Sequence, residues 1–179
     1  MRCINGATGL EEWRSTTVPE YGMQVELLAD VTGDDIPEVI VGSWENAVSV
    51  LHGADGTQVW KTTVGTLNGG DVTTVSGIAD LDHDGVPDVI AGSYDEYVYA
   101  MSGVDGAVIW AYNTGHRVYS VAPIADVNGD GVDDVIVGNQ NLSSSDQQVV
   151  HVLSGAGFAP VFRDGFETGN TSSWSDVLP

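Results

Sequence analysis

The sequence contains a single cysteine, Cys3, and no apolar run of 18 residues. One cysteine excludes an intrachain disulfide and a thiolate metal site. The missing apolar run excludes a membrane-spanning helix, so we expect no membrane insertion. Residues 1–6 also lack the apolar stretch of a signal peptide.

Basic residues are scarce as well, because 5 Lys and Arg stand against 26 Asp and Glu, for a formal charge of −21. Nucleic acids and anionic membrane surfaces repel such a chain, so neither is expected as a partner. The acids are concentrated: twelve of the 26 lie in residues 30–38, 80–88 and 126–134, four in each. With 42% hydrophobic residues, the chain can still bury a core.

Each of these three segments is a nine-residue loop with oxygen-bearing side chains at positions 1, 3, 5 and 9. Ca²⁺ takes about 6–8 oxygen ligands, and a short loop of this kind can wrap around such an ion. Carboxylates crowded into one loop raise one another's pKa, and a bound cation removes that cost. A solvated acidic surface loop is the alternative, but three copies in the same phase argue against it.

The loops do not fit an EF-hand, which needs flanking helices and a bidentate acid at position 12. Position 12 is Val41, Ala91 or Val137, each inside an apolar run. The ligand set therefore closes at position 9, with the backbone carbonyl of position 7 completing it. We expect one Ca²⁺ per loop, up to three in all.

The acidic loops recur at spacings of 50 residues, from Asp30 to Asp80, and 46 residues, from Asp80 to Asp126. Repeats of about 40–50 residues with short strands are typical of propeller blades. A second marker, a glycine followed seven positions later by an aromatic residue, occurs four times: Gly6 and Trp13, Gly53 and Trp60, Gly103 and Trp110, Gly155 and Phe162. Residues 1–17 are therefore interpreted as the back half of a unit, and we expect a fragment or a truncated gene product.

Each full unit reads as four strands separated by turns of Gly, Asp and Asn, without helical periodicity. The strands on either side of the loop are rich in Val and Ile, which indicates burial on both faces. The third strand alternates in polarity, and the fourth carries the aromatic marker. The predicted strands are 23–29, 38–41, 47–51 and 58–63; 72–79, 88–91, 97–101 and 107–113; and 118–125, 134–137, 149–153 and 158–162. A polar loop insertion, 139–146, precedes the third strand of the last unit.

The predicted fold class is all-β, of β-propeller type, with about 3.5 four-stranded blades and no significant helix. Closed propellers typically have about 4–8 blades, so we expect a partial propeller or one completed by self-association. The predicted division is a half blade at 1–17, blades at 18–66, 67–115 and 116–163, and a C-terminal tail at 164–179.

The loops resemble the Asp-x-Asp-x-Asp-Gly-x-x-Asp loop of FG-GAP repeats, also called VCBS repeats, in the integrin-α-like propeller family. The resemblance covers roughly residues 22–163 and implies a Ca²⁺ ion between the first and second strands of each blade. It implies as ligands Asp30, Thr32, Asp34, the Ile36 carbonyl and Glu38; Asp80, Asp82, Asp84, the Val86 carbonyl and Asp88; and Asp126, Asn128, Asp130, the Val132 carbonyl and Asp134.

The first loop departs from the family pattern at two positions. Thr32 is a short, neutral ligand, and Asp35 replaces the glycine that usually takes a left-handed backbone. We therefore expect the first site to be the weakest and the second, with four carboxylates, to be the tightest.

The fourth strands, in Val59–Gly65 and Ile109–Gly115, resemble the Gly-x-x-x-Trp strand of quinoprotein-like (PQQ) propeller blades. The likeness implies no quinone. It implies that the strand tryptophans, Trp13, Trp60 and Trp110, pack between blades.

The sequence contains no Gly-x-Ser-x-Gly elbow, Walker loop or His-Glu-x-x-His motif. Surface or packing roles are expected for His52 and His151. The turns between second and third strands share a face opposite the calcium loops, and Trp44 and Tyr94 occupy equivalent positions there. The candidate ligand face comprises Trp44, Glu45, Tyr94, Asp95, Asn139 and Gln140. Packing of both rings at the blade edge is the alternative.

These features predict a non-catalytic, calcium-binding module of an extracellular or cell-surface protein, serving adhesion or the binding of a glycan or protein. Calcium sites with Kd of about 10⁻⁴–10⁻³ M suffice outside cells, and residues 162–175 resemble a C-terminal tail of secreted bacterial proteins. The alternatives are a lectin and a fragment of a calcium-dependent, lyase-like enzyme acting on polysaccharide. The shortage of basic residues argues against the enzyme.

Overall fold

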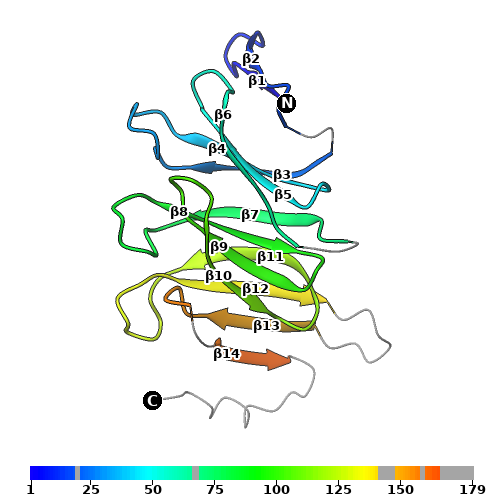
Figure 1. The fold of residues 1–179 in the computed structure, drawn as a ribbon, viewed down its shortest axis with the longest axis vertical. Coiled ribbons are helices and arrows are strands. Elements are labelled where there is room, and N and C mark those ends of the chain that lie inside the picture. The colour runs from blue at the N-terminus through cyan, green and yellow to red at the C-terminus, as the bar shows by residue number, and fades with distance from the viewer. Residues whose placement is uncertain (19–20, 66–68, 141–147, 158–159, 166–179) are drawn as a thin grey trace.

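The structure, a computed structural model, describes residues 1–18, 21–65, 69–140, 148–157 and 160–165, and its strands all belong to antiparallel sheets (Figure 1). The N-terminal hairpin pairs β1 (Arg2–Ile4) with β2 (Glu11–Arg14). Three four-stranded blades follow. Blade 1 contains β3 (Gly22–Leu28), β4 (Glu38–Ser43), β5 (Ala47–Leu51) and β6 (Gln58–Thr63). Blade 2 contains β7 (Val72–Ile78), β8 (Asp88–Ser93), β9 (Tyr97–Met101) and β10 (Val108–Asn113). Blade 3 contains β11 (Arg117–Ile124), β12 (Asp134–Gln140), β13 (Gln148–Leu153) and β14 (Pro160–Gly165).

Within each blade the strands pair in chain order, so every connection is a hairpin. The blades stack face to face, with the N-terminal hairpin at one end and β14 at the other (Figure 1). The first strand of blade 2, β7, contacts the first strands of both neighbouring blades, β3 and β11. The described residues include no helix, and therefore none that could cross a membrane. The predicted all-β, propeller-type fold with three and a half units is confirmed.

Two apolar cores hold the stack together, one at each junction between full blades. Ile40 and Val50 of blade 1 pack with Val75 and Val89 of blade 2 in the first core. Ile90 and Ala100 of blade 2 take the corresponding places in the second core, with residues of blade 3. At each junction a glycine on the second strand, Gly42 or Gly92, leaves room for a valine of the next blade, and a Cβ atom there would come within 3 Å of it.

The strand boundaries agree with the sequence prediction to within two residues, except in β12 and β14. β12 runs on to Gln140, because its ladder continues through Asn139 paired with Val149 and Gln140 paired with Gln148. Asn139 and Gln140 are thus strand residues and not part of an inserted loop, whose remaining positions, 141–146, lie outside the described residues. β14 runs from Pro160 to Gly165, two residues into the predicted tail, and positions 166–179 are not described. The division of the chain into domains stays a prediction.

Burial also differs from what the sequence suggests. β5 alternates in polarity yet is buried along its whole length, because β4 and β6 flank it and its Val48 and Val50 pack in the core between blades 1 and 2. β3 should be buried on both faces, but Val25 and Leu27 are 52% and 65% exposed. The equivalent residue of blade 2, Val75, is fully buried because blade 1 covers it. The described N-terminal unit has only two strands, and it leaves this part of β3 uncovered.

Candidate metal centre and ligand face

The three acidic loops occupy the same place in each blade, between the first and second strands. In every loop the position-1 aspartate accepts hydrogen bonds from backbone N–H groups further along the loop. Its Oδ2 atom lies 2.7 Å from Asp35 N in the first loop, 2.8 Å from Gly85 N in the second and 2.8 Å from Gly131 N in the third. These donors fix the carboxylate in place before any ligand binds.

The same donors set the ionisation of the position-1 side chains. Desolvation raises the pKa of Asp30 and Asp80, but the backbone N–H groups outweigh it and bring both values below the ordinary one. For Asp126 the N–H of Gly131 is the largest influence, and it also lowers the pKa. The three side chains are therefore anionic at neutral pH, as metal ligands must be.

The backbone of each loop turns through left-handed conformations at positions 4 and 6. Glycine takes these conformations without cost, as Gly33, Gly129 and Gly131 do. Asp35 and His83 take them with φ of 64° each, although a side chain makes this conformation about 1–2 kcal/mol less favourable. The left-handed backbone expected at Asp35 is present. The requirement at position 4 was missed, although Gly33 and Gly129 in the sequence were a signal for it.

The position-9 carboxylates, Glu38, Asp88 and Asp134, are fully buried. Each accepts a hydrogen bond from the backbone N–H seven residues earlier: Val31 to Glu38 at 2.9 Å, Leu81 to Asp88 at 2.6 Å and Val127 to Asp134 at 2.8 Å. Desolvation raises the pKa of Asp88 to about 6, and the charges of Asp82 and Asp84 add to the effect. Desolvation also raises the pKa of Asp134. Buried charge of one sign is costly unless a counter-charge compensates it.

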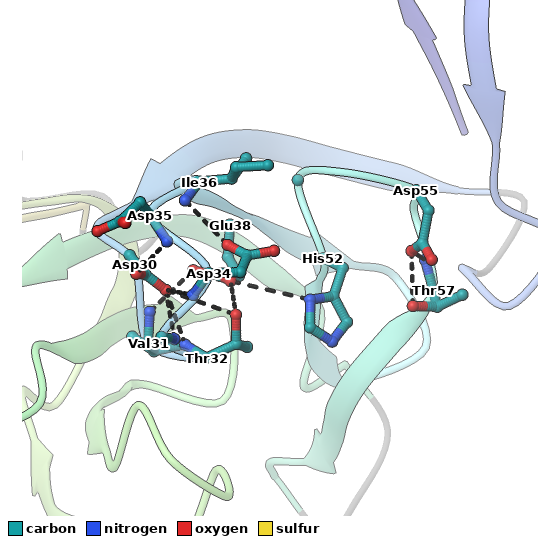
Figure 2. Close-up of polar contacts among 12 residues, drawn as sticks. Asp30, Val31, Thr32, Asp34, Asp35, Ile36, Glu38, His52, Asp55 and Thr57 are labelled. Carbon is teal, nitrogen blue, oxygen red and sulfur yellow. Dashed lines mark hydrogen bonds and ion pairs between the residues drawn. The ribbon is translucent and has the colours of Figure 1, made fainter.

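Carboxylate oxygens converge closely enough in two loops to hold a metal ion. Asp30, Asp34 and Glu38 place one oxygen each within 4.8 Å of one another, as do Asp80, Asp82 and Asp88. In the first loop the Thr32 hydroxyl donates to Glu38 Oε1 at 2.7 Å, and His52 Nδ1 lies 4.0 Å from the same oxygen (Figure 2). Thr32 thus lies beside the buried carboxylate, where a neutral oxygen ligand is expected.

The third loop has the same backbone arrangement but a different set of side-chain contacts. Asn128 Nδ2 donates to Asp130 Oδ2 at 2.9 Å, and the Ser154 hydroxyl donates to the same oxygen at 2.7 Å. These donors, with Ser154 the largest influence, lower the pKa of Asp130. Here an amide and a hydroxyl offset part of the loop's negative charge. The second loop relies on carboxylates at all four ligand side chains, so it has the greatest need for a cation.

One glycine in the loop between the third and fourth strands of each blade lies between the metal loop and the neighbouring unit. These glycines are Gly53, Gly103 and Gly155. Gly103 N donates to Asp88 Oδ1 at 2.9 Å, and Gly155 N to Asp134 Oδ1 at 3.3 Å. The carbonyl of the same glycine accepts from a tryptophan of the preceding unit: Trp13 to Gly53 at 2.8 Å, Trp60 to Gly103 at 2.8 Å and Trp110 to Gly155 at 2.7 Å. The predicted packing of these tryptophans between units is confirmed, and each metal loop is one glycine away from an interblade contact.

The glycine itself is required by the loop that it covers. A Cβ atom on Gly53 or Gly103 would lie 1.9 Å from the carbonyl oxygen of Pro37 or Pro87, at position 8 of the metal loop. The same atom on Gly155 would lie 2.0 Å from the Asp133 carbonyl. The sequence marker of glycine and aromatic residue therefore records a three-part contact of loop, glycine and tryptophan.

The candidate ligand face lies at the opposite ends of the strands, and its residues have different surroundings. Trp44 is 51% exposed and stacks on Tyr21, with ring centroids 5.5 Å apart. Tyr94 packs against Tyr119, and Arg117 lies over its ring at 5.0 Å. Glu45 pairs with Lys61 at 3.3 Å.

Of the remaining face residues, Asn139 is buried, with Nδ2 3.1 Å from His151 Nε2, and Gln140 is exposed at the end of β12. Asp95 accepts a hydrogen bond from the Tyr99 hydroxyl at 2.6 Å. The residues are thus spread over three blades, and their role in binding stays a prediction.

Comparison with known proteins places these features in a family. The FG-GAP-like repeat matches residues 30–91 and the FG-GAP repeat matches residues 118–153, together more than half of the chain. No curated protein matches it. BamB from Moraxella catarrhalis has a similar structure, with a TM-score of 0.59 and 18% identity over 88% of this chain and 40% of its own. Sqt1 from Saccharomyces cerevisiae has a TM-score of 0.65 and 15% identity over 89% of this chain and 42% of its own.

Both of these structures are propeller proteins, and at such low identity the similarity shows the fold alone. The chain spans about two fifths of the length of each.

Proposed function

Because the chain belongs to the FG-GAP repeat family, we propose that it is a non-catalytic, calcium-binding β-propeller module of an extracellular protein. In this proposal the acidic loops are scaffold sites, and the opposite face binds a glycan or protein ligand. The observation that carries the metal part is the buried carboxylate at position 9 of every loop. A buried carboxylate beside further acids is a poor arrangement without a cation and a good one with it.

The donor set favours calcium over other ions. The implied ligands are all oxygens, and the side-chain ligands in the described loops come from aspartate, glutamate, asparagine and threonine. Mg²⁺ prefers near-ideal octahedral geometry with several waters, whereas Ca²⁺ accepts an irregular shell of protein oxygens. Three Ca²⁺ ions would offset six of the 21 net negative charges. A bound ion would hold together the two strands on either side of the loop. Through the position-9 carboxylate it would also be connected to the glycine that donates to that carboxylate, Gly103 in blade 2 and Gly155 in blade 3.

The enzyme alternative has less support, because the described basic side chains are engaged elsewhere. Arg2 and Arg14 pair with Glu11, Lys61 pairs with Glu45, and Arg117 lies over Tyr94. An enzyme acting on acidic polysaccharide would need such groups to line a cleft.

Thermal unfolding in calcium and in chelator tests the metal part. At a calcium concentration 100 times the Kd, each site stabilises the folded chain by about 2.7 kcal/mol, so we expect a marked fall in the melting temperature on chelation. Elemental analysis should find up to three calcium ions per chain. Asp88→Asn should remove one ion and part of the calcium-dependent stability.

The matched control is Asp105→Asn. Asp105 is an exposed turn residue whose Oδ1 accepts a hydrogen bond from Ala107 N at 2.9 Å, and asparagine also has an Oδ1 acceptor. The control should bind as much calcium as the wild type. An unchanged melting curve on chelation, with no metal bound, would overturn the assignment of all three loops.

A further inference from the structure

A cavity of about 420 Å³ lies between blades 1 and 2, apart from the metal loops. The end of β6 and the residues after it form one side, through Thr63, Val64 and Gly65. Asp95 and β9 residues form the other, and the cavity also reaches Val108. Its volume falls within the range of about 300–1,000 Å³ that is usual for small-molecule sites.

Two tyrosines of β9 form an aromatic wall of this cavity. Tyr97 and Tyr99 are two residues apart on a strand, so their side chains point to the same face. Their ring centroids are 5.8 Å apart, and the ring planes are inclined by 28°, which is a stacked arrangement. Tyr99 is only 9% exposed and belongs to the core between the blades, whereas Tyr97 is partly exposed. The buried ring therefore holds the accessible ring in position.

A carboxylate is fixed beside this wall. Asp95 Oδ1 accepts from Tyr97 N at 3.1 Å, and Oδ2 accepts from the Tyr99 hydroxyl at 2.6 Å. Each carboxylate oxygen offers about two acceptor positions, so both oxygens can accept a further hydrogen bond. Burial and the bond to Asp95 raise the pKa of Tyr99, so the phenol keeps its proton and remains a donor.

Glycine at position 65 lies close against the carboxylate. A Cβ atom there would lie 2.5 Å from Asp95 Oδ2, and the φ angle of 77° also favours glycine. Any other residue would press on the carboxylate and reduce the room beside it.

The tyrosine wall belongs to blade 2 alone. By strand register, the residues equivalent to Tyr97 and Tyr99 are Ala47 and Ser49 in blade 1, and Val149 and His151 in blade 3. Blade 1 thus has no aromatic residue at these positions, and blade 3 has one, His151, whose ring meets Tyr112 edge-on at 6.1 Å instead of forming a stacked pair along its own strand. A stacking role common to all blades does not explain why two tyrosines and a held aspartate occur together here.

We propose that this cavity binds one pyranose ring of a neutral glycan, with the apolar face of the sugar on Tyr97 and its hydroxyl groups donating to Asp95. The inference rests on the ligand-binding part of the proposed function. None of the described residues that line the cavity is basic, and Asp95 would repel a uronate, sulfate or phosphate. A quaternary ammonium ligand is best held among several ring faces, whereas the stacked tyrosines present a single wall.

Saturation-transfer NMR with neutral methyl glycosides of common hexoses, in calcium, tests the proposal. At least one glycoside should receive transfer from the wild type. Tyr97→Ala should weaken its binding about tenfold, the effect of losing a stacked ring, and Tyr97→Phe should keep most of the affinity. Asp95→Asn should weaken binding because the acceptor loses its charge. Val104→Ala, an exposed turn residue of the same blade outside the lining, is the matched control. Melting temperatures in calcium verify that every variant is folded.

Each other outcome overturns the inference. Binding that is lost in Trp44→Ala and kept in Tyr97→Ala would move the glycan site to the exposed tryptophan, and the proposed ligand face would survive without this cavity. Binding of tetramethylammonium but of no glycoside would make the cavity a cation site. Absence of any glycoside binding by the folded, calcium-loaded chain would exclude the pyranose site, while the melting experiment would still decide the metal part separately.

Discussion

At the scale of single residues, the position-9 carboxylates show how the chain keeps costly groups in its core. Asp88 is fully buried, receives two backbone N–H bonds, and still has a pKa raised to about 6 by desolvation and by Asp82 and Asp84. Its folded pKa lies above the ordinary 3.8, so the folded state holds a proton that the unfolded state has already lost. Stability linked to this group therefore falls as the pH rises from about 4 to about 6.

We accordingly expect the chain in chelator to melt at a higher temperature at pH 5 than at pH 7. The raised pKa of Asp134 acts in the same direction, and the lowered values of Asp30, Asp80 and Asp126 act only below their ordinary value of 3.8. Calcium must displace the proton from Asp88, so the stabilisation by calcium should shrink below about pH 6. Scanning calorimetry of wild type and Asp88→Asn measures both trends. A chelated chain less stable at pH 5 than at pH 7 would contradict this assignment.

A second residue-scale prediction concerns the glycine over the metal loop. Gly103→Ala should destabilise the chain by about 1–3 kcal/mol, the usual cost of overpacking, because the new Cβ would meet the Pro87 carbonyl at 1.9 Å. Gly6 holds the same place in the N-terminal hairpin, which has no acidic loop, and no atom lies within 4 Å of a Cβ there. Gly6→Ala should therefore change stability by less than about 0.5 kcal/mol. Urea unfolding in calcium measures both, and equal effects would refute the packing argument.

At the scale of elements, the repeating contact is a pair of hydrogen bonds through the two backbone groups of one glycine. Trp60 of β6 donates to the Gly103 carbonyl, and Gly103 N donates to Asp88 of the metal loop. The arrangement recurs at the junction of blades 2 and 3 through Trp110, Gly155 and Asp134. Ion binding in one blade and packing of the preceding blade thus meet at the same loop.

Trp60→Phe keeps an aromatic ring but leaves the Gly103 carbonyl without its donor, which should cost about 1–3 kcal/mol. Because Trp60 and Asp88 act on the same glycine, the double variant with Asp88→Asn should depart from additivity by at least about 0.5 kcal/mol in calcium. Trp13→Phe with Asp88→Asn is the matched control, since Trp13 donates to Gly53 where the N-terminal hairpin meets blade 1. That pair should be additive, and additivity of both pairs would disprove the coupling.

At the scale of the whole molecule, the stack has two unequal ends. Val25 and Leu27 of β3 are exposed at one end, and Ile136 of β12 is 37% exposed at the other. Its equivalents Ile40 and Ile90 are fully buried by the blade that follows each of them. Both ends thus carry surfaces that are buried at the internal junctions.

We expect these surfaces to promote self-association of the isolated chain in calcium. The double variant Val25→Lys and Leu27→Lys should reduce association, because charged side chains oppose burial of this face. Light scattering across a range of concentrations measures the effect, and Leu10→Lys, at an exposed leucine of the N-terminal hairpin, is the control. A wild-type chain that stays monomeric at the highest concentration would exclude self-association.

The features that could be predicted from the sequence are local patterns of a few residues that recur in each unit. Strand, loop and strand follow one another locally, so the spacing of Asp30, Asp34 and Glu38 indicated a metal loop. The apolar residue at position 12, Val41 in the first loop, excluded an EF-hand. The Gly and Trp marker likewise indicated packing between blades. Repetition made these signals reliable, because the same physical requirement appears three or four times in one chain.

What the sequence determined by itself was therefore the unit: four strands, an acidic loop and an interblade tryptophan. Only the tertiary structure decided the exposure of Val25 and Leu27, the burial of Asn139 and the contact of Gly103 with two partners. It also decided the cavity that Gly65 at the end of blade 1 lines together with Asp95 and Tyr97 of blade 2. These features depend on which neighbour covers a face, and residues 40 or more positions apart meet only when the blades stack.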